Sequence, residues 1–321
     1  MPKRKGIHPL VGAATLVPLA IGLFTPKTAP HVRRAGHVKH FAAAEVGSAC
    51  TLPFDAIKQE HEIDSSCDSA GSSTSDAQAA QNEAKNNFCA TSTPVSLNFD
   101  NFSQLQQAAE NAGVSFGSDS RLPDDRAPLQ NILQISTQGR VGEGSVVRVA
   151  AFVMNAHYSN VSKGETVNCK LTGIENNDIH IVLGQNVVPS GQKLSEAEEC
   201  ASITAEISPH FRPDFWTPDT LNSHNAHLFR FTGQLFFDAA HRPCMGSKAS
   251  PRRRSIWEVH PTYAVDICIE PSNNCTADND ENWVALSDFV GPGAGSNETR
   301  LWLPDEISRE FGSARAAITQ S

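Results

Sequence analysis

The chain has 321 residues, of which 39% are hydrophobic and 19% charged, and its formal net charge is −9. This length allows one large or two modest domains, and the composition is that of a polar globular protein. Residues 1–39 hold seven Lys or Arg and no acid, so the remainder of the chain is strongly acidic. An acidic body repels nucleic acid and anionic membranes at long range, so a polyanion site would have to be a local basic patch.

The N-terminus has the pattern of an export signal. A basic start, Met1-Pro2-Lys3-Arg4-Lys5, precedes an apolar run over residues 10–24. This order is typical of a secretory signal peptide, and the run is short for a membrane span. The following residues stay basic without a clean cleavage site, so an uncleaved anchor is the alternative. We predict a signal peptide or N-terminal anchor in residues 1–40 and an exported protein, periplasmic or extracellular.

The number of cysteines also favours an exported protein. The chain has eight Cys, none in a Cys-x-x-Cys pair, at positions 50, 67, 89, 169, 200, 244, 268 and 275. An even number behind a leader predicts disulfides formed in an oxidising compartment, with buried free thiols as the alternative. The pairing stays open, because eight cysteines allow 105 connectivities.

Residues 41–140 form a polar, helical, Cys-containing region. Apolar residues fall on one face over residues 76–88 and again over residues 102–112, which predicts two helices. The region has too little apolar mass for a core of its own. We predict a layer held by Cys50, Cys67 and Cys89 and packed on the domain C-terminal to it.

The sequence pattern of residues 141–272 is typical of a β domain. Strands are predicted at 145–157, 166–172, 178–184, 201–208, 226–238 and 255–269, with a short helix at 213–221. The order predicts a mainly β, OB-like small antiparallel barrel with an extra strand and a short helix. Gly233, inside a strong strand, fits a tight bend at a barrel corner. A β-sandwich is the alternative, and residues 273–321 are predicted to be a polar C-terminal tail.

Several motifs of this region resemble those of a known group. They are Asn177-Asp178-Ile179-His180-Ile181, the run from Ala205 to Pro213, the run from Phe231 to Asp238 with His241, and Trp257-Glu258-Val259-His260-Pro261. The set resembles exported bacterial OB-fold-like proteins that carry a Trp-Glu-(Ile/Val)-His-Pro strand motif. The resemblance covers most of residues 50–270. It implies one folded unit in an exported protein and supplies no catalytic residues.

Two strands present an acid and an imidazole on one face. Strand alternation places Asp178 beside His180 and Glu258 beside His260. If these strands are neighbours, the four side chains converge, with Glu206 on the intervening strand. Carboxylate and imidazole donors suit Zn, Mn or non-haem Fe, so a divalent metal ion is the candidate cofactor. A metal-free acid–base site and an ordinary solvated face are the alternatives.

Two loops favour ligand binding, because OB-folds use loops at these places to bind oligonucleotides and oligosaccharides. The candidate binding residues are His157, Tyr158, Lys163, Arg230, Asp238, His241, Arg252, Arg253 and Arg254. The three consecutive arginines are the densest basic cluster outside the leader and suit phosphate contact. A solubilising loop is the alternative, and Arg230 equally suits an ion pair with an acid.

Three functions remain open at this point. The sequence favours an exported binding module whose partner is an oligomeric anion, either nucleic acid or glycan. A structural envelope protein without a small ligand is the second candidate. A metal-dependent hydrolase or nuclease that uses the Asp178, His180, Glu258 and His260 cluster is the third. No Gly-x-Ser-x-Gly elbow or phosphate-binding loop is present, which argues against a serine hydrolase or a nucleotide site.

Overall fold

The computed structural model describes residues 66–88, 90, 93–189, 191–244, 249 and 251–290. All of them belong to one compact unit. The predictions for the leader, for Cys50 and Cys89, and for most of the C-terminal tail lie outside these residues. Within the described part of the chain, no helix is long and apolar enough to cross a bilayer.

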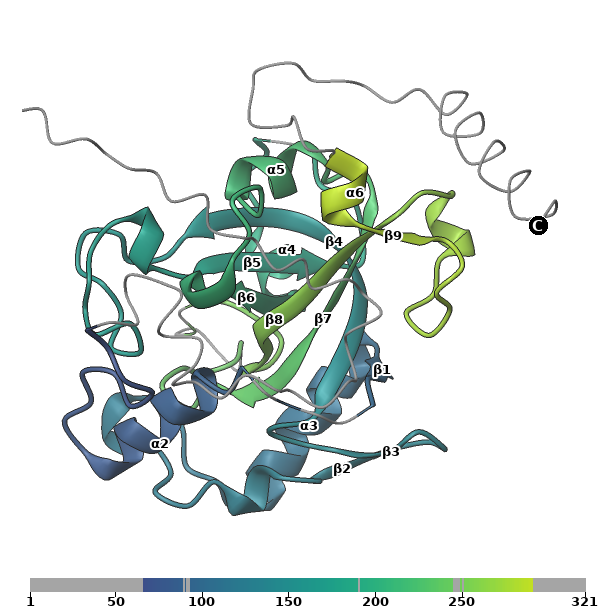
Figure 1. Ribbon diagram of the computed structural model, residues 1–321. Coiled ribbons are helices and arrows are strands. Elements are labelled where there is room, and N and C mark those ends of the chain that lie inside the picture. The colour runs from purple at the N-terminus through teal and green to yellow at the C-terminus, as the bar shows by residue number, and fades with distance from the viewer. Residues whose placement is uncertain are drawn as a thin grey trace, which may run out of the picture. The chain divides into compact units, whose positions relative to one another are not determined.

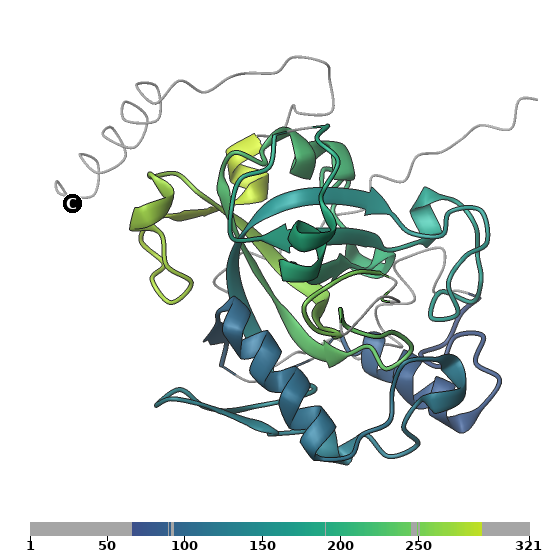
Figure 2. The same cartoon turned by 180° about the vertical axis from the view of Figure 1, so that it is seen from behind.

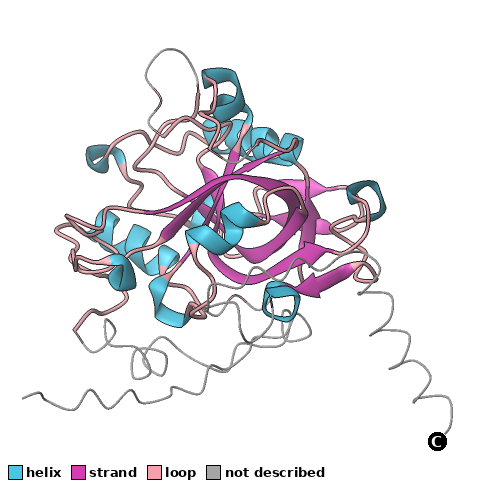
Figure 3. Ribbon diagram, turned by 90° about the horizontal axis from the view of Figure 1, so that it is seen from above, coloured by secondary structure: helices cyan, strands magenta, loops and turns pink. Residues whose placement is uncertain are grey.

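A closed barrel of five strands forms the centre of the fold (Figures 1 and 3). Its strands are β4 (Val146–Tyr158), β5 (Ile179–Gly184), β6 (Ile203–Ile207), β7 (Leu228–Phe237) and β8 (Trp257–Cys268). They pair in the order β4-β5-β6-β8-β7, and β7 pairs again with β4 to close the ring. The β6–β8 pair is parallel, whereas the other barrel pairs are antiparallel. The predicted mainly β barrel is confirmed.

Short strands extend this sheet at two places. β1 (Val95–Leu97) pairs with β4 in parallel, and β9 (Trp283–Ala285) pairs with β8 in the antiparallel sense. β2 (Leu133–Ile135) and β3 (Gly139–Val141) form a separate hairpin.

One predicted strand is wrong. Residues 166–172 form turns instead, and Cys169 and Lys170 adopt positive φ angles of 54° and 58°. Left-handed backbone of this kind does not continue a strand. The apolar and polar residues of this segment alternate as in a strand, but the segment pairs with none of the described strands, and Cys169 is bonded to Cys67.

The barrel core follows the strand alternation that the sequence shows. Ile179, Ile181 and Leu183 of β5 are fully buried. Trp257 of β8 is also fully buried, and its ring lies 5.0 Å from the ring of Phe237 on β7. Each side chain of this size stabilises the fold by about 1.5–3 kcal/mol when it is removed from water. The inward phase of β5 and β8 therefore fixes which residues face outward.

Gly233 lies at an irregularity of the β7–β8 pairing. The register shifts on both sides of this residue. A Cβ atom there would approach the backbone oxygen of Pro261 to 2.4 Å, so a larger residue would force the strands apart. The strand pairing is thus irregular at the position where a bend is predicted.

The helices are short and lie outside the barrel. They are α2 (Asp76–Lys85), α3 (Phe99–Asn111), α4 (Glu196–Ala201), α5 (Pro218–Ser223) and α6 (Leu286–Val290). Five 3-10 turns cover Asp119–Arg121, Ala127–Leu129, Ile174–Asn176, Pro209–Phe211 and Ser272–Asn274. Figure 2 shows α3 beside the β2–β3 hairpin. The N-cap side chains of α2 and α3 are Ser75 and Asn98, each of which accepts a backbone N–H of the first turn.

Three disulfides join the described residues: Cys67–Cys169, Cys200–Cys244 and Cys268–Cys275. All six cysteines of the described part are therefore paired. Such bonds persist in oxidising compartments, so they are compatible with an exported location.

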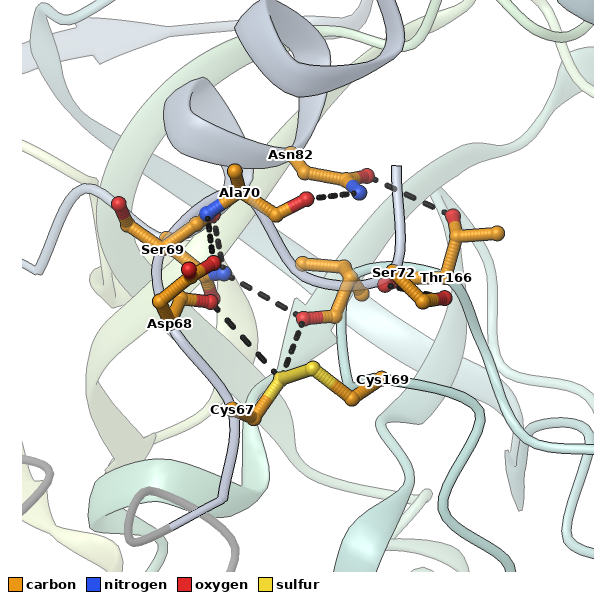
Figure 4. Close-up of a disulfide and its surroundings, with 10 residues drawn as sticks. Cys67, Asp68, Ser69, Ala70, Ser72, Asn82, Thr166 and Cys169 are labelled. Carbon is orange, nitrogen blue, oxygen red and sulfur yellow. Dashed lines mark hydrogen bonds between the residues drawn. A yellow bond between two sulfur atoms is a disulfide. The ribbon is translucent and has the colours of Figure 1, made fainter. Parts of the chain in front are cut away.

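The Cys67–Cys169 bond fastens the segment before α2 to the loop before β5 (Figure 4). Around it, the Ser72 N–H donates to the carbonyl of Thr166 at 2.8 Å, and the Asn82 amide donates to the carbonyl of Ala70 at 2.8 Å. Gly71 has φ +58°, and a Cβ atom there would lie 2.2 Å from the Thr166 oxygen. The close approach fixes α2 against this loop.

Replacing both Cys67 and Cys169 with Ser is expected to lower the free energy of unfolding by about 2–4 kcal/mol. The bond joins residues 102 positions apart, so its loss frees a long stretch of the unfolded chain. Urea unfolding followed by Trp fluorescence measures the change. The matched control replaces Cys268 and Cys275 with Ser. These residues are only 7 positions apart, so the free energy of unfolding should fall by less. Equal losses in the two double variants would contradict the chain-entropy argument.

Candidate metal centre

Three barrel strands carry polar side chains on the face turned away from the core. Asp178 precedes β5, which contributes His180, while β8 contributes Glu258 and His260. Glu206 of β6 lies directly opposite His180 in the β5–β6 register, and β6 pairs with β8 next to Glu258. The four sequence-predicted metal residues thus lie on neighbouring segments, with Glu206 between them.

This face is covered rather than solvated, because α2 packs on it. Lys85 Nζ lies 3.5 Å from Glu206 Oε2, and Gln81 Nε2 donates to Asp238 Oδ1 at 3.4 Å. The Gln234 amide of β7 donates to the carbonyl of Ala84 at 2.8 Å. Burial alone would lower the pKa of Lys85, but Glu206 and other nearby carboxylates hold it well above the ordinary value. Lys85 therefore remains a cation above the cluster.

Glu206 lies between two imidazoles. His260 Nδ1 is 2.6 Å from its Oε2, and His180 Nε2 is 3.2 Å from its Oε1. Burial would raise the pKa of Glu206, but His180, Lys85 and His260 together hold it well below the ordinary value. The same pairing raises the pKa of His180 to about 9 against the opposing effect of burial. Glu206 is thus ionised, and the metal-free centre balances it with protons on histidine.

Asp178 carries an oxygen without a hydrogen bond. Its Oδ1 accepts from the Asn168 amide at 3.1 Å, but among the described residues no donor bonds to its Oδ2. That oxygen lies 3.8 Å from His260 Nε2, and Asp178 is only 1% exposed. Burial, followed by the neighbouring Glu165, raises the pKa of Asp178 to about 6. A buried carboxylate oxygen of this kind suits a cation, because unpaired buried polar groups are unfavourable.

Glu165 completes the centre from the loop before β5. Its Oε1 lies 3.5 Å from His180 Nε2 and accepts from the Ser159 hydroxyl at 2.9 Å. Its Oε2 accepts from the Asp178 N–H at 3.3 Å. The sequence reasoning missed this residue as a donor, because Glu165 reaches the barrel only through the turns that Cys169 anchors. The Glu165 side chain is 11% exposed and the His180 side chain 26% exposed, so they mark the open side of the centre.

Two sets of donors could each hold a metal ion. One is Glu165, Asp178 and His180, and the other is Asp178, Glu206 and His260. Within each set the donor atoms lie within 4.8 Å of one another. Carboxylate oxygens and imidazole nitrogens form a common ligand set for Zn and related divalent ions. Asp178 belongs to both sets.

Glu258 was predicted as a ligand but joins neither of these sets. Its Oε2 accepts from Arg253 at 2.6 Å, and the second guanidinium nitrogen of Arg253 bonds Asp238 Oδ2 at 2.6 Å. Asp238 also lies 2.5 Å from His241 Nδ1. Burial and the carboxylates of Glu206 and Asp238 raise the pKa of Glu258 to about 7. These four residues form a second, adjoining ion-pair cluster.

The predicted ligand-binding residues do not gather in one place. The guanidinium group of Arg252 bonds Glu199 at 3.1 Å, and that of Arg254 bonds Asp100 at 2.9 Å. Arg253 is 1% exposed inside the second cluster. Arg230 is buried between Asp266 and Asp280 and lies over the Trp283 ring. The arginine run is therefore engaged in ion pairs within the protein.

Of the residues predicted for the first loop, His157 and Tyr158 lie instead at the end of β4. His157 is exposed, and its ring centroid lies 5.8 Å from that of His180. Burial, followed by the charge of His180, lowers the pKa of His157. The Tyr158 ring lies 5.4 Å from the Arg212 guanidinium, and Lys163 is exposed in the adjacent turn. His157 is thus the predicted ligand-loop residue closest to the metal centre.

Comparison with known proteins finds no matching family model, no matching curated protein and no matching solved structure. The functional argument therefore depends on the geometry of the centre itself.

Proposed function

We propose that this protein is an exported, metal-dependent hydrolase built on an OB-like barrel. The observation that carries the proposal is the buried Oδ2 of Asp178, which has no hydrogen-bond partner among the described residues and belongs to a residue shared by two sets of carboxylate and imidazole donors. A bound divalent ion would satisfy this oxygen. It would also lower the pKa of a water molecule enough to supply hydroxide at neutral pH.

The OB-like assignment is supported by the strand order. The chain runs through three antiparallel strands, crosses by way of α5 to β7, and ends the barrel in β8 between β6 and β7. This path, with a helix between the third and fourth barrel strands, matches the five-stranded Greek-key barrel of the OB-fold. The three disulfides and the N-terminal pattern support export to the periplasm or the exterior.

The more open donor set, Glu165, Asp178 and His180, is the proposed site of the catalytic ion. His157 stands next to His180 at the exposed end and is placed to accept the proton of the attacking water. In the hydrolysis, the water oxygen bonds to the electrophilic atom of the ester and the bond to the leaving oxygen breaks. The leaving oxygen then takes a proton, so that one water is added across the ester bond.

Purified protein is expected to contain a stoichiometric divalent ion and to hydrolyse a chromogenic ester. Elemental analysis measures the ion, and p-nitrophenyl acetate and bis(p-nitrophenyl) phosphate test which class of ester is cleaved. His180→Ala should weaken metal affinity by more than the roughly 10–100-fold loss typical of outer-shell substitutions. The matched control is His224→Ala on the end of α5, which should change neither quantity. Absence of both metal and hydrolysis, with Mn²⁺ or Zn²⁺ added, would reject the proposal.

A binding module for an oligomeric anion remains the second candidate, and the OB-like strand order favours it. The end of β4 and the turn after it offer His157, Tyr158 and Lys163 to such a ligand, but the arginines of the second loop are engaged elsewhere. Retention on single-stranded DNA and on glycan arrays at low and high salt tests this function. Metal-independent binding without hydrolysis would favour it over the hydrolase.

A further inference from the structure

We infer that the centre holds two metal ions bridged by Asp178. This inference depends on the proposed hydrolase function and extends it. The second ion would lie on Asp178, Glu206 and His260, all of which are at most 3% exposed.

The shared carboxylate is the first argument for a bridge. Asp178 belongs to both donor sets, and its two oxygens have different surroundings. Oδ1 accepts from Asn168, whereas Oδ2 faces His260 Nε2 without a hydrogen bond. One carboxylate that serves two sets would hold two ions close together, as in two-metal sites.

The orientation of His260 is the second argument. Its Nδ1 lies 2.6 Å from Glu206 Oε2, while its Nε2 points toward Asp178 Oδ2 at 3.8 Å. His260 thus stands between the two carboxylates of its donor set, with one ring nitrogen directed to each.

The charge of the cluster is the third argument. Three carboxylates meet there, namely Glu165, Asp178 and Glu206. Lys85 is the permanent cation in contact with them, so two negative charges remain for histidine protons or metal ions to balance. Buried charges of this kind are tolerated where they are paired or coordinate metals.

Mn²⁺ titration of metal-free full-length protein tests the inference directly. We expect two Mn²⁺ ions per chain and an electron paramagnetic resonance spectrum of an exchange-coupled pair. Saturation at one Mn²⁺ per chain with an uncoupled six-line spectrum would overturn the two-metal inference. Hydrolysis that persists with one ion would leave the proposed function intact, so the two failures are distinguishable.

Single substitutions then test which residues bind each of the two ions. Glu206→Gln and Glu165→Gln should each reduce the stoichiometry from two ions to one, abolish the coupled spectrum and lower kcat/KM for bis(p-nitrophenyl) phosphate. The control Glu196→Gln alters an exposed carboxylate of α4 and should retain both ions. Retention of two coupled ions by folded Glu206→Gln would overturn the assignment. The wild-type titration keeps the inference falsifiable if that variant fails to fold.

Discussion

Replacing Arg253 with Met is expected to lower the free energy of unfolding by about 3–5 kcal/mol, because breaking a buried ion pair leaves its partners uncompensated. Arg253 bonds Asp238 and Glu258 at 2.6 Å each, and all three side chains are at most 4% exposed. Burial opposes its charge, but the two carboxylates raise the pKa of Arg253 above the ordinary value. Urea unfolding at pH 7 measures the loss.

The neighbouring arginine supplies the matched control. Arg252 is 45% exposed and pairs with Glu199 and Glu196 on the surface. Exposed pairs contribute about 0–1 kcal/mol, so Arg252→Met should have a small effect. Removing the stranded carboxylates with Asp238→Asn and Glu258→Gln should restore part of the stability of the Arg253 variant. Similar losses at positions 252 and 253 would show that the buried pair has no special role.

In metal-free protein, Glu258→Gln is expected to gain stability relative to wild type as the pH rises from 4.5 to about 7. Burial and the carboxylates of Glu206 and Asp238 raise the pKa of Glu258 from 4.5 to about 7. The folded state then holds the Glu258 proton more tightly than the unfolded state, so wild-type stability falls as the pH rises through this window. The shift corresponds to roughly 3 kcal/mol. A glutamine side chain stays neutral at every pH, so the Glu258→Gln variant does not lose this stability.

Glu206→Gln should show the opposite sign. Its carboxylate has a depressed pKa, so its contribution is present above the ordinary value of 4.5 and is lost as the pH falls through the lower folded value. Urea unfolding with a chelator at pH 3, 4.5, 6 and 8 compares both variants with wild type. A pH-independent difference for Glu258→Gln, or the same trend for the two variants, would contradict the electrostatic account.

The sequence predicted the barrel well because its strands alternate strictly. The phase of Ile179, Ile181 and Leu183 placed Asp178 and His180 on the outer face, and the buried Trp257 did the same for Glu258 and His260. Gly233 also marked a position where the strand pairing is irregular. Local spacing was sufficient at these positions, because a strand has only two faces.

The cover over that face could not be predicted in this way. Gln81 and Lys85 of α2 meet polar partners on the barrel, so a hydropathy pattern shows no reason for their burial. Glu165 depends on the pairing of Cys67 with Cys169, which the sequence leaves among 105 connectivities. Three identical arginines likewise gave no sign that only Arg253 turns inward.

The bond between Cys67 and Cys169 also has a consequence for the rate at which a bound ion would exchange. Asp178, Glu206 and His260 lie beneath α2, and an ion on them could leave only when this cover opens locally. The disulfide fastens the cover to the loop that supplies Glu165, so opening must displace both. An ion acquired during oxidative folding would therefore have a long residence time, and the identity of the metal would be set by the ions available when the bond forms.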